Sequence, residues 1–315
     1  KGLPWHRGTQ TTPTDLTCPA MIATFVPCGA LARPPPNLSR ACTTQEACGR
    51  VRVQTSADGL ELFVDETFAS VYRPGQGASG GIWDVLVAPV LLLPDPPRSV
   101  LILGFGGGTI ARQLQGLCPE ADVVGVEKDG EVLEVARRHF ALEELDAQVI
   151  ARDALDFLNE DKRLFDVIID DIFVGYARGV HKPSWLLRRG LALAAKRLRP
   201  GGLLISNTID EAADVQTILG RRFPHLIQLR LEGYDNYVLV ASSLSLDARE
   251  LAAALPKTKM LATVAEQISI GSPSAVRRRP HRALYKEPRW LRLAKVALAL
   301  ATSRLARIVS SDRKK

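Results

Sequence analysis

Glycine and acidic residues recur in this sequence where predicted strands end, at positions typical of nucleotide binding. Residues 104–108 read Gly-Phe-Gly-Gly-Gly and lie directly between a strand-like run and a helical one. Glycine is favoured there because a side chain would block the approach of a ligand to the backbone at a helix N-terminus. A dinucleotide fingerprint would place its last glycine at Thr109, whereas this loop has Gly104, Gly106 and Gly108. The spacing therefore favours a nucleotide ligand other than a dinucleotide.

Acidic residues follow each of the next three predicted strands. Glu127 ends the second strand, where a carboxylate can accept hydrogen bonds from both ribose hydroxyls of an adenosine. Asp153 follows the third strand, where it can accept a hydrogen bond from an adenine amino group, and Asp170 and Asp171 end the fourth. Taken singly, Glu127 or Asp153 could simply cap the next helix. Together with the glycine loop, the four acids predict a ligand site outside the carboxyl ends of the strands.

The pair Asp170 and Asp171 suggests the reaction chemistry. Successive residues of a strand point to opposite faces, so we expect only one of the two to enter the site. A carboxylate there can act as a general base, which takes a proton from a reacting group. Tyr176 and Arg178, in the loop that follows, are candidate contacts to the substrate. The alternative is that both are ordinary exposed loop residues.

The elements that must position these residues alternate along the chain. The expected strands are 100–103, 122–126, 148–150, 165–169 and 203–205, and the expected helices are 83–93, 109–117, 130–140, 183–198 and 211–222. Apolar strands bounded by helices predict a parallel sheet that is covered on both faces. Residues 226–231 and 237–241 flank a turn and predict a terminal antiparallel hairpin. The predicted fold is α/β, with a doubly wound, mostly parallel seven-stranded sheet and a small N-terminal β unit.

Residues 99–242 resemble the class I S-adenosylmethionine-dependent methyltransferase fold. The segments that carry the resemblance are 100–109, 124–129, 151–153 and 198–204. More narrowly, residues 60–242 are similar to the spermidine synthase-like branch of that fold. This likeness rests on Leu62-Phe63-Val64-Asp65, Trp83-Asp84-Val85-Leu86, Asp166-Val167-Ile168-Ile169-Asp170-Asp171 and Asn236-Tyr237-Val238-Leu239-Val240-Ala241.

The resemblance implies a cofactor and roles for particular residues. The cofactor would be S-adenosylmethionine or, alternatively, its decarboxylated form, and Gly104, Gly106, Gly108, Glu127, Asp153 and Asp170 are the expected cofactor-binding residues. The branch's catalytic aspartate falls on Asp171. Trp83 and Asp84, before the first strand, are candidate substrate contacts.

Five positions depart from the polyamine site of that branch. Ala69 replaces a glutamine, Ile82-Trp83 replaces a tyrosine–histidine pair, and Val174 replaces a second aspartate after the fourth strand. Gly107 stands where an aspartate holds the aminopropyl amine. Holding both cationic ends of a diamine requires paired carboxylates. The glycine triplet instead resembles spermidine synthase-like proteins that transfer methyl groups to protein amines.

The sequence is therefore compatible with three functions. The first is methyl transfer from S-adenosylmethionine to an amine-bearing acceptor, either a small molecule or a protein. The second is aminopropyl transfer in polyamine biosynthesis, which would need compensating acids such as Asp84 or Glu66. The third is a catalytically silent binding or scaffold protein, because a fold does not fix a function.

Composition divides the chain into five stretches. They are a disordered or targeting-like leader (1–48), a small N-terminal β unit (49–95), a nucleotide-binding transferase domain (96–245), a helical extension (246–272) and a basic tail with an amphipathic helix (273–315). The β unit offers a surface for a homodimer. The net charge of +7 arises from the tail, whose 13 basic and 2 acidic residues give +11, while residues 1–272 carry −4. We therefore expect no nucleic-acid binding by the core and contact of the tail with an anionic surface, with a solvated terminal helix as the alternative.

The cysteines and histidines give no pattern for a metal site. Five cysteines are present, none in a C-x-x-C pair, and the five histidines are scattered. Unpaired thiols are typical of a reducing compartment. We therefore expect no bound metal and a cytoplasmic protein, with organelle targeting by the leader as the alternative.

Overall fold

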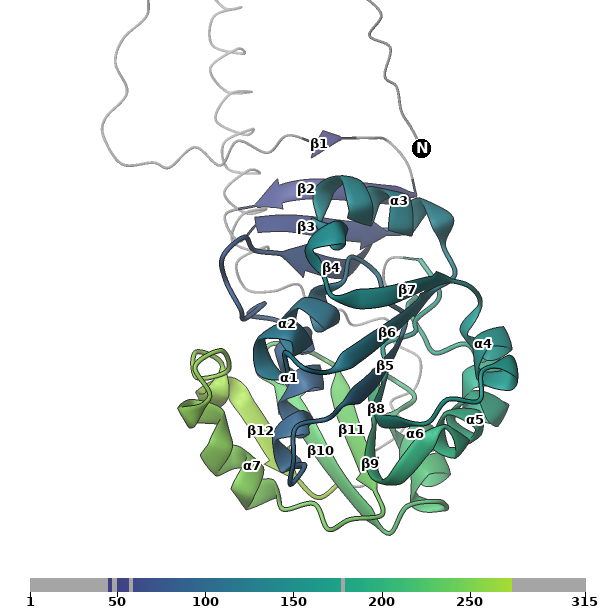
Figure 1. Cartoon of the computed structure of the whole chain (residues 1–315), viewed down its shortest axis with the longest axis vertical. Coiled ribbons are helices and arrows are strands. Elements are labelled where there is room, and N and C mark those ends of the chain that lie inside the picture. The colour runs from purple at the N-terminus through teal and green to yellow at the C-terminus, as the bar shows by residue number, and fades with distance from the viewer. Residues whose placement is uncertain (1–44, 47–49, 57–58, 177–178, 274–315) are drawn as a thin grey trace, which may run out of the picture. The chain divides into compact units, whose positions relative to one another are not determined.

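The computed structural model describes residues 45–46, 50–56, 59–176 and 179–273 (Figure 1). Nearly all of the predicted leader and of the predicted basic tail lies outside these residues. Within the described ranges, none of the helices combines the length and the apolar character needed to cross a lipid bilayer.

The described residues form a large sheet of eight strands, in the order β12-β10-β11-β9-β8-β5-β6-β7. The strands are β5 (Ser99–Leu103), β6 (Asp122–Glu127), β7 (Ala147–Ala151), β8 (Phe165–Asp170), β9 (Leu198–Thr208), β10 (His225–Leu231), β11 (Tyr237–Ser242) and β12 (Ile268–Gly271). Strands β5 to β9 pair in parallel, while β10, β11 and β12 join antiparallel. The predicted doubly wound, mostly parallel fold with a terminal hairpin is confirmed.

The eighth strand corrects the predicted helical extension. Helix α7 (Ala248–Ala254) does occupy the start of that stretch, but β12 ends it. β12 pairs with β10, with Leu229 opposite Ile270. This pairing covers an edge of β10 that the seven-stranded arrangement would leave open.

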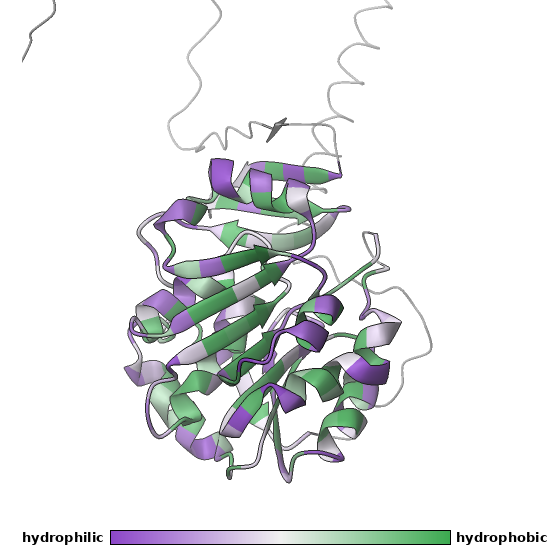
Figure 2. Cartoon of the chain, turned by 45° about the vertical axis from the view of Figure 1, so that its right-hand side comes forward, coloured by the Kyte–Doolittle hydropathy of each residue, from purple (hydrophilic) through white to green (hydrophobic). Residues whose placement is uncertain are grey.

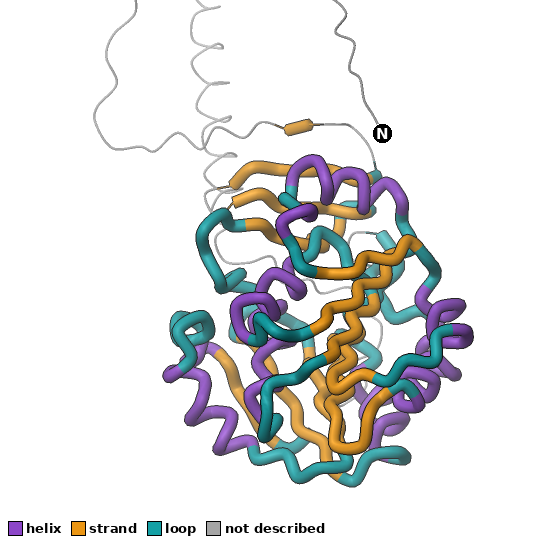
Figure 3. Tube along the Cα trace, viewed as in Figure 1, coloured by secondary structure: helices purple, strands orange, loops and turns teal. Residues whose placement is uncertain are grey.

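Helices cover both faces of the sheet (Figure 3). They are α1 (Ile82–Val87), α2 (Thr109–Leu117), α3 (Gly130–His139), α4 (Ala154–Glu160), α5 (Leu191–Lys196), α6 (Ala212–Gly220) and α7, with a π turn at Leu186–Gly190 and 3-10 turns at Ala88–Leu92, Leu142–Glu144, Leu255–Lys257 and Ala265–Gln267. Alternation along β5 sends Val100 and Ile102 into a core cluster with α1, α2 and α7. Leu101 and Leu103 join a second cluster with α4, α5 and α6. The central strands are therefore mostly hydrophobic (Figure 2).

The N-terminal β unit is a separate antiparallel sheet. Its strands are β1 (Gln45–Glu46), β2 (Val51–Ser56), β3 (Gly59–Val64) and β4 (Thr67–Tyr72). The predicted hairpin of β2 and β3 is present, and β4 is an addition that the sequence pattern did not indicate. Leu62 packs in one buried cluster with Val132 of α3 and Phe140. The small sheet is thereby attached beside the start of α3, which follows β6.

Candidate functional site

The glycine loop joins β5 to α2, as its position between a strand and a helix indicated. Gly104, Gly106 and Gly108 have φ angles of +84°, +56° and +82°, a left-handed conformation that favours glycine. The backbone N–H of Gly106 donates to Glu127 Oε2 at 3.0 Å. The loop and the acid that ends β6 therefore meet, as predicted.

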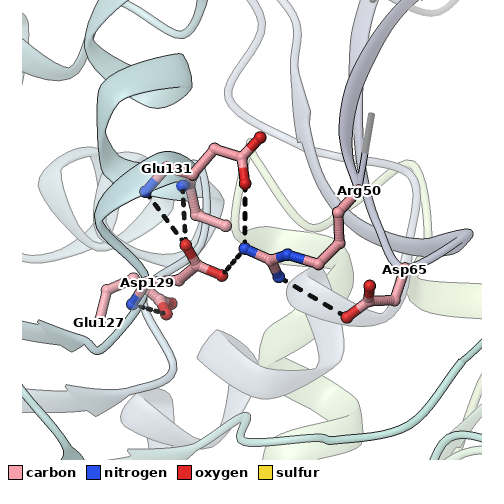
Figure 4. A network of polar contacts seen from close by, with 6 residues as sticks. Arg50, Asp65, Glu127, Asp129 and Glu131 are labelled. Atoms are coloured by element: carbon pink, nitrogen blue, oxygen red, sulfur yellow. Dashed lines mark hydrogen bonds and ion pairs between the residues drawn. The ribbon is translucent and has the colours of Figure 1, made fainter. Parts of the chain in front are cut away.

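Glu127 is fixed from its other side by the start of α3. Its Oε1 accepts a hydrogen bond from the backbone N–H of Asp129 at 3.1 Å. Asp129 caps α3 and also accepts a hydrogen bond from Arg50 of the N-terminal unit (Figure 4). The guanidinium of Arg50 further lies 3.1 Å from Glu131 and 3.6 Å from Asp65. The hydrogen bond to Asp129 and the surrounding carboxylates raise the pKa of Arg50. The N-terminal unit thus contacts the helix start whose backbone donates to Glu127.

Asp153 lies at the same edge of the sheet, two residues after β7. Its Oδ1 caps α4 by accepting from the backbone N–H of Leu155 at 2.8 Å. The neighbouring backbone N–H of Arg152 donates to Glu127 O at 2.9 Å. The capping role that the sequence offered as an alternative is therefore present, at a strand end whose backbone is hydrogen-bonded to that of Glu127.

Asp171 is held by two side-chain donors. Asn207 Nδ2 donates to Oδ1 at 2.7 Å, and Trp83 Nε1 donates to Oδ2 at 3.2 Å. Asn236 orients Asn207 by donating to its Oδ1 at 2.8 Å. Burial raises the pKa of Asp171 to about 6, against these hydrogen bonds and the charge of Lys182, which lower it. Such a carboxylate is largely ionised at neutral pH and can accept a proton.

Asp171 and the glycine loop lie side by side. The backbone N–H of Asp171 donates to Leu103 O at 2.9 Å, at the end of β5. A Cβ added to Gly104 would lie 2.8 Å from the carbonyl oxygen of Asp171. The absence of a side chain at Gly104 is therefore what lets the loop approach the acid so closely.

The structure corrects the prediction that Asp170 binds the cofactor. Asp170 is fully buried, and its carboxylate pairs with Lys182 Nζ at 2.9 Å. It also accepts hydrogen bonds from Ser206 Oγ at 2.6 Å and from the backbone N–H of Ile172 at 3.1 Å. Alternation along the strand turns Asp170 into the protein, as expected for one member of the pair.

Asp84 is also corrected, because it does not face the site. It is fully buried and accepts hydrogen bonds from Ser79 N and Oγ at 2.7 and 2.8 Å, from Gly80 N at 2.8 Å and from Gln113. Burial raises the pKa of Asp84, against the hydrogen bonds from Ser79 and its neighbours. Its carboxylate organises the loop before α1.

The structure describes only one of the two loop candidates. Tyr176 is 66% exposed, and Arg178 lies outside the described residues. Val174 forms an isolated bridge with His181 at the base of the same loop.

Two further residues were missed by the sequence reasoning. Asn207 lies on β9 near its end, so the rule applied to the other strand ends would have found it. Ser70 of β4 accepts a hydrogen bond from the backbone N–H of Gly107 at 2.7 Å. A Cβ added to Gly107 would lie 2.9 Å from Ser70 Cβ and 3.0 Å from Phe140 Cδ1, so this position has no room for a carboxylate side chain.

Comparisons with known proteins agree with this fold. Residues 100–202 match a family model described as a methyltransferase domain. The chain is 32% identical over 127 residues to polyamine aminopropyltransferase 2 of Pseudomonas aeruginosa, covering 38% of this chain and 36% of the relative. It is 30% identical over 162 residues to an eEF1A lysine and N-terminal methyltransferase homolog of Drosophila melanogaster, covering 47% and 24%.

A solved structure shows the same fold. A probable spermidine synthase from Corynebacterium glutamicum superposes with a TM-score of 0.59 at 18% identity, covering 78% of this chain and 97% of that one. The chain spans about a third of the length of the curated polyamine aminopropyltransferases that it matches.

Proposed function

The chain has the fold of class I S-adenosylmethionine-dependent methyltransferases, in the form shared with spermidine synthases, and from this premise we propose that it transfers a methyl group to an amine-bearing acceptor. The observation that carries the proposal is the carboxylate of Asp171. Trp83 and Asn207 hold it beside the glycine loop, and burial raises its pKa to about 6.

The residues at the sheet edge fit the adenosine part of the donor. Glu127 is half-buried, and each of its oxygens accepts one backbone hydrogen bond. A carboxylate oxygen can accept two, so Glu127 retains capacity for ribose hydroxyls. Asp153, on the adjacent strand end, would accept from the adenine amino group. When bound, S-adenosylmethionine supplies an electrophilic methyl group on a sulfonium.

The task left to the protein is to orient the acceptor amine and to take its proton. The two side-chain donors fix both oxygens of Asp171, so the proton would be accepted at a defined point. General-base catalysis of this kind contributes about 10²–10⁴-fold to a rate. Alignment of the reactants can supply a further ~7–11 kcal/mol.

Aminopropyl transfer is the second candidate, since several relatives are named polyamine aminopropyltransferases. Three observations weigh against it. Ser70 and Phe140 close the space at Gly107, Asp84 already accepts hydrogen bonds from Ser79 and Gly80, and Asp170 is paired. The acids that a second cationic group would need are therefore absent or engaged at these positions.

The test compares S-adenosylmethionine with its decarboxylated form, against a panel of polyamines and a protein lysate. We expect transfer of label only from S-adenosylmethionine, and a rise in the melting temperature on binding it. Aminopropyl transfer from the decarboxylated donor would overturn the proposal, and the absence of a shift with either donor would favour the silent alternative.

Two variants of Glu127 test whether the donor binds at this edge of the sheet. Glu127→Ala should weaken donor binding about 10–100-fold, the loss expected for hydrogen bonds to a charged group. Glu127→Gln keeps one acceptor oxygen and should lose less. Unchanged affinity in Glu127→Ala would place the donor elsewhere.

A further inference from the structure

The ion pair between Lys182 and Asp170 has no part in the reaction as described so far. Lys182 Nζ lies 2.9 Å from Asp170 Oδ2, and both side chains are fully buried. The ammonium also lies 4.4 Å from the ring centre of Phe173. A buried ion pair is weak evidence for stability, since apolar side chains of similar size often serve as well. Because stability does not by itself account for the pair, its position beside Asp171 points to a role in the reaction.

Lys182 is held at its backbone as well as at its ammonium group. Its backbone N–H donates to Glu211 Oε1 at 3.0 Å, at the start of α6. Asp170, its partner, is in turn fixed by Ser206 of β9. The loop after β8 thus delivers one cation to a fixed point behind the strand end.

The charges that act on Asp171 come from these two residues. Among the described residues packed against it, β8 contributes Asp170 and the following loop contributes Lys182, while α1 and β9 contribute the uncharged Trp83 and Asn207. The charge of Lys182 lowers the pKa of Asp171 and the charge of Asp170 raises it. The two influences oppose each other.

Resting on the proposed function, we propose that Lys182 is a positioning residue for Asp171. By pairing with Asp170, Lys182 offsets the negative charge next to Asp171. Asp171 then stays ionised and can take the proton of the acceptor amine. Without the cation, two neighbouring carboxylates would share one buried strand end, where like charges disfavour ionisation.

The test is a carboxyl NMR titration of the full chain labelled with ¹³C-aspartate, in which the Asp171 signal is identified by its loss in Asp171→Asn. Asp170→Asn removes a negative charge and should lower the titration midpoint of Asp171 by about 0.5–1 pH unit. Lys182→Met removes a positive charge and should raise it by about as much. The double variant should fall between them. Lys196→Met removes an exposed charge and serves as the control, with no shift expected.

Opposite shifts support the proposal, because a loss of packing does not follow the sign of the charge removed. Shifts in the same direction, or an unchanged midpoint in Asp170→Asn, overturn it. If Lys182→Met does not fold, Asp170→Asn decides alone. The titration needs no substrate, so its outcome does not depend on activity. A wild-type protein without transferase activity would contradict the proposed function but would not change the titration result. In an active protein, the pH profile of kcat should move in the same directions.

Discussion

Glu127 and Asp171 lie at the ends of two strands on the same sheet edge, but their carboxylates are held in different ways. Glu127 accepts from two backbone N–H groups, one in the glycine loop and one at the start of α3. Asp171 accepts from two side chains, Trp83 and Asn207, and burial raises its pKa to about 6.

The difference separates two tasks. Backbone donors at a loop and a helix start are fixed by the fold, and they suit a group that only binds. A carboxylate with a raised pKa suits a group that changes its protonation state during a reaction. The comparison therefore predicts that changes at the two acids affect different measurements.

The largest expected effect is on turnover. Asp171→Asn should lower kcat about 10²–10⁴-fold, because the amide cannot accept the proton. The donor dissociation constant, measured by calorimetry, should stay nearly unchanged. In the wild type, kcat should fall as the pH drops below about 6, where Asp171 is protonated. A variant that lost donor binding along with turnover would erase the proposed division of tasks.

The same substitution should change the pH dependence of stability. The pKa of Asp171 is about 6 in the folded chain, against about 3.9 in an unfolded one, so the folded state binds this proton more tightly. The resulting stabilisation is fully present below about pH 4 and is lost as the pH rises through 6. Relative to Asp171→Asn, the wild type should thus lose about 1–3 kcal/mol of unfolding free energy between these pH values.

Denaturant unfolding of both proteins at pH 4, 5, 6 and 7 measures this difference. The comparison is between slopes, so a constant offset from the lost Trp83 hydrogen bond does not affect it. Parallel pH dependences in the two proteins would mean that the Asp171 carboxylate titrates normally.

The parts of this site that were predictable from the sequence are local ones. The apolar run before Gly104 and the acid at Glu127 each mark a strand end within a few residues, and parallel strands bring such ends to one edge. Alternation also indicated that only one of Asp170 and Asp171 would face the site. The choice of Asp171 came from family resemblance and matches its placement beside the glycine loop.

The parts that were missed depend on contacts between distant segments. Nothing in the local pattern pairs Lys182 with Asp170, because the loop between them must first return to the strand end. Asp84 has the residue type of a substrate contact, but it is buried where Gln113 of α2, 29 residues later in the chain, donates to its carboxylate. Burial of a polar side chain is a property of the assembled core and not of its neighbours in sequence.

A smaller effect is expected where the N-terminal unit meets the glycine loop. Gly107→Ala should lower the unfolding free energy by about 1–2 kcal/mol, because its Cβ would press on Ser70 Cβ and the Phe140 ring. Gly130→Ala is the matched control, since a Cβ there has nothing within 4 Å. The double variant Gly107→Ala/Ser70→Gly should recover part of the loss, measured as a coupling energy. Equal stability of Gly107→Ala and Gly130→Ala would show that the loop is less tightly covered than described.

The smallest effect is expected at Arg50, and it bears on the binding half of the comparison. Arg50 joins the small sheet to Asp129 and Glu131, but its side chain is 42% exposed, so solvent and salt screen these pairs. Arg50→Met should therefore cost less than about 1 kcal/mol of stability, and less still at high salt. Its effect on donor affinity should be slight, because Glu127 keeps both of its backbone hydrogen bonds without the arginine. A large, salt-insensitive loss of affinity would instead mean that the N-terminal unit, and not the backbone at the strand end, fixes Glu127.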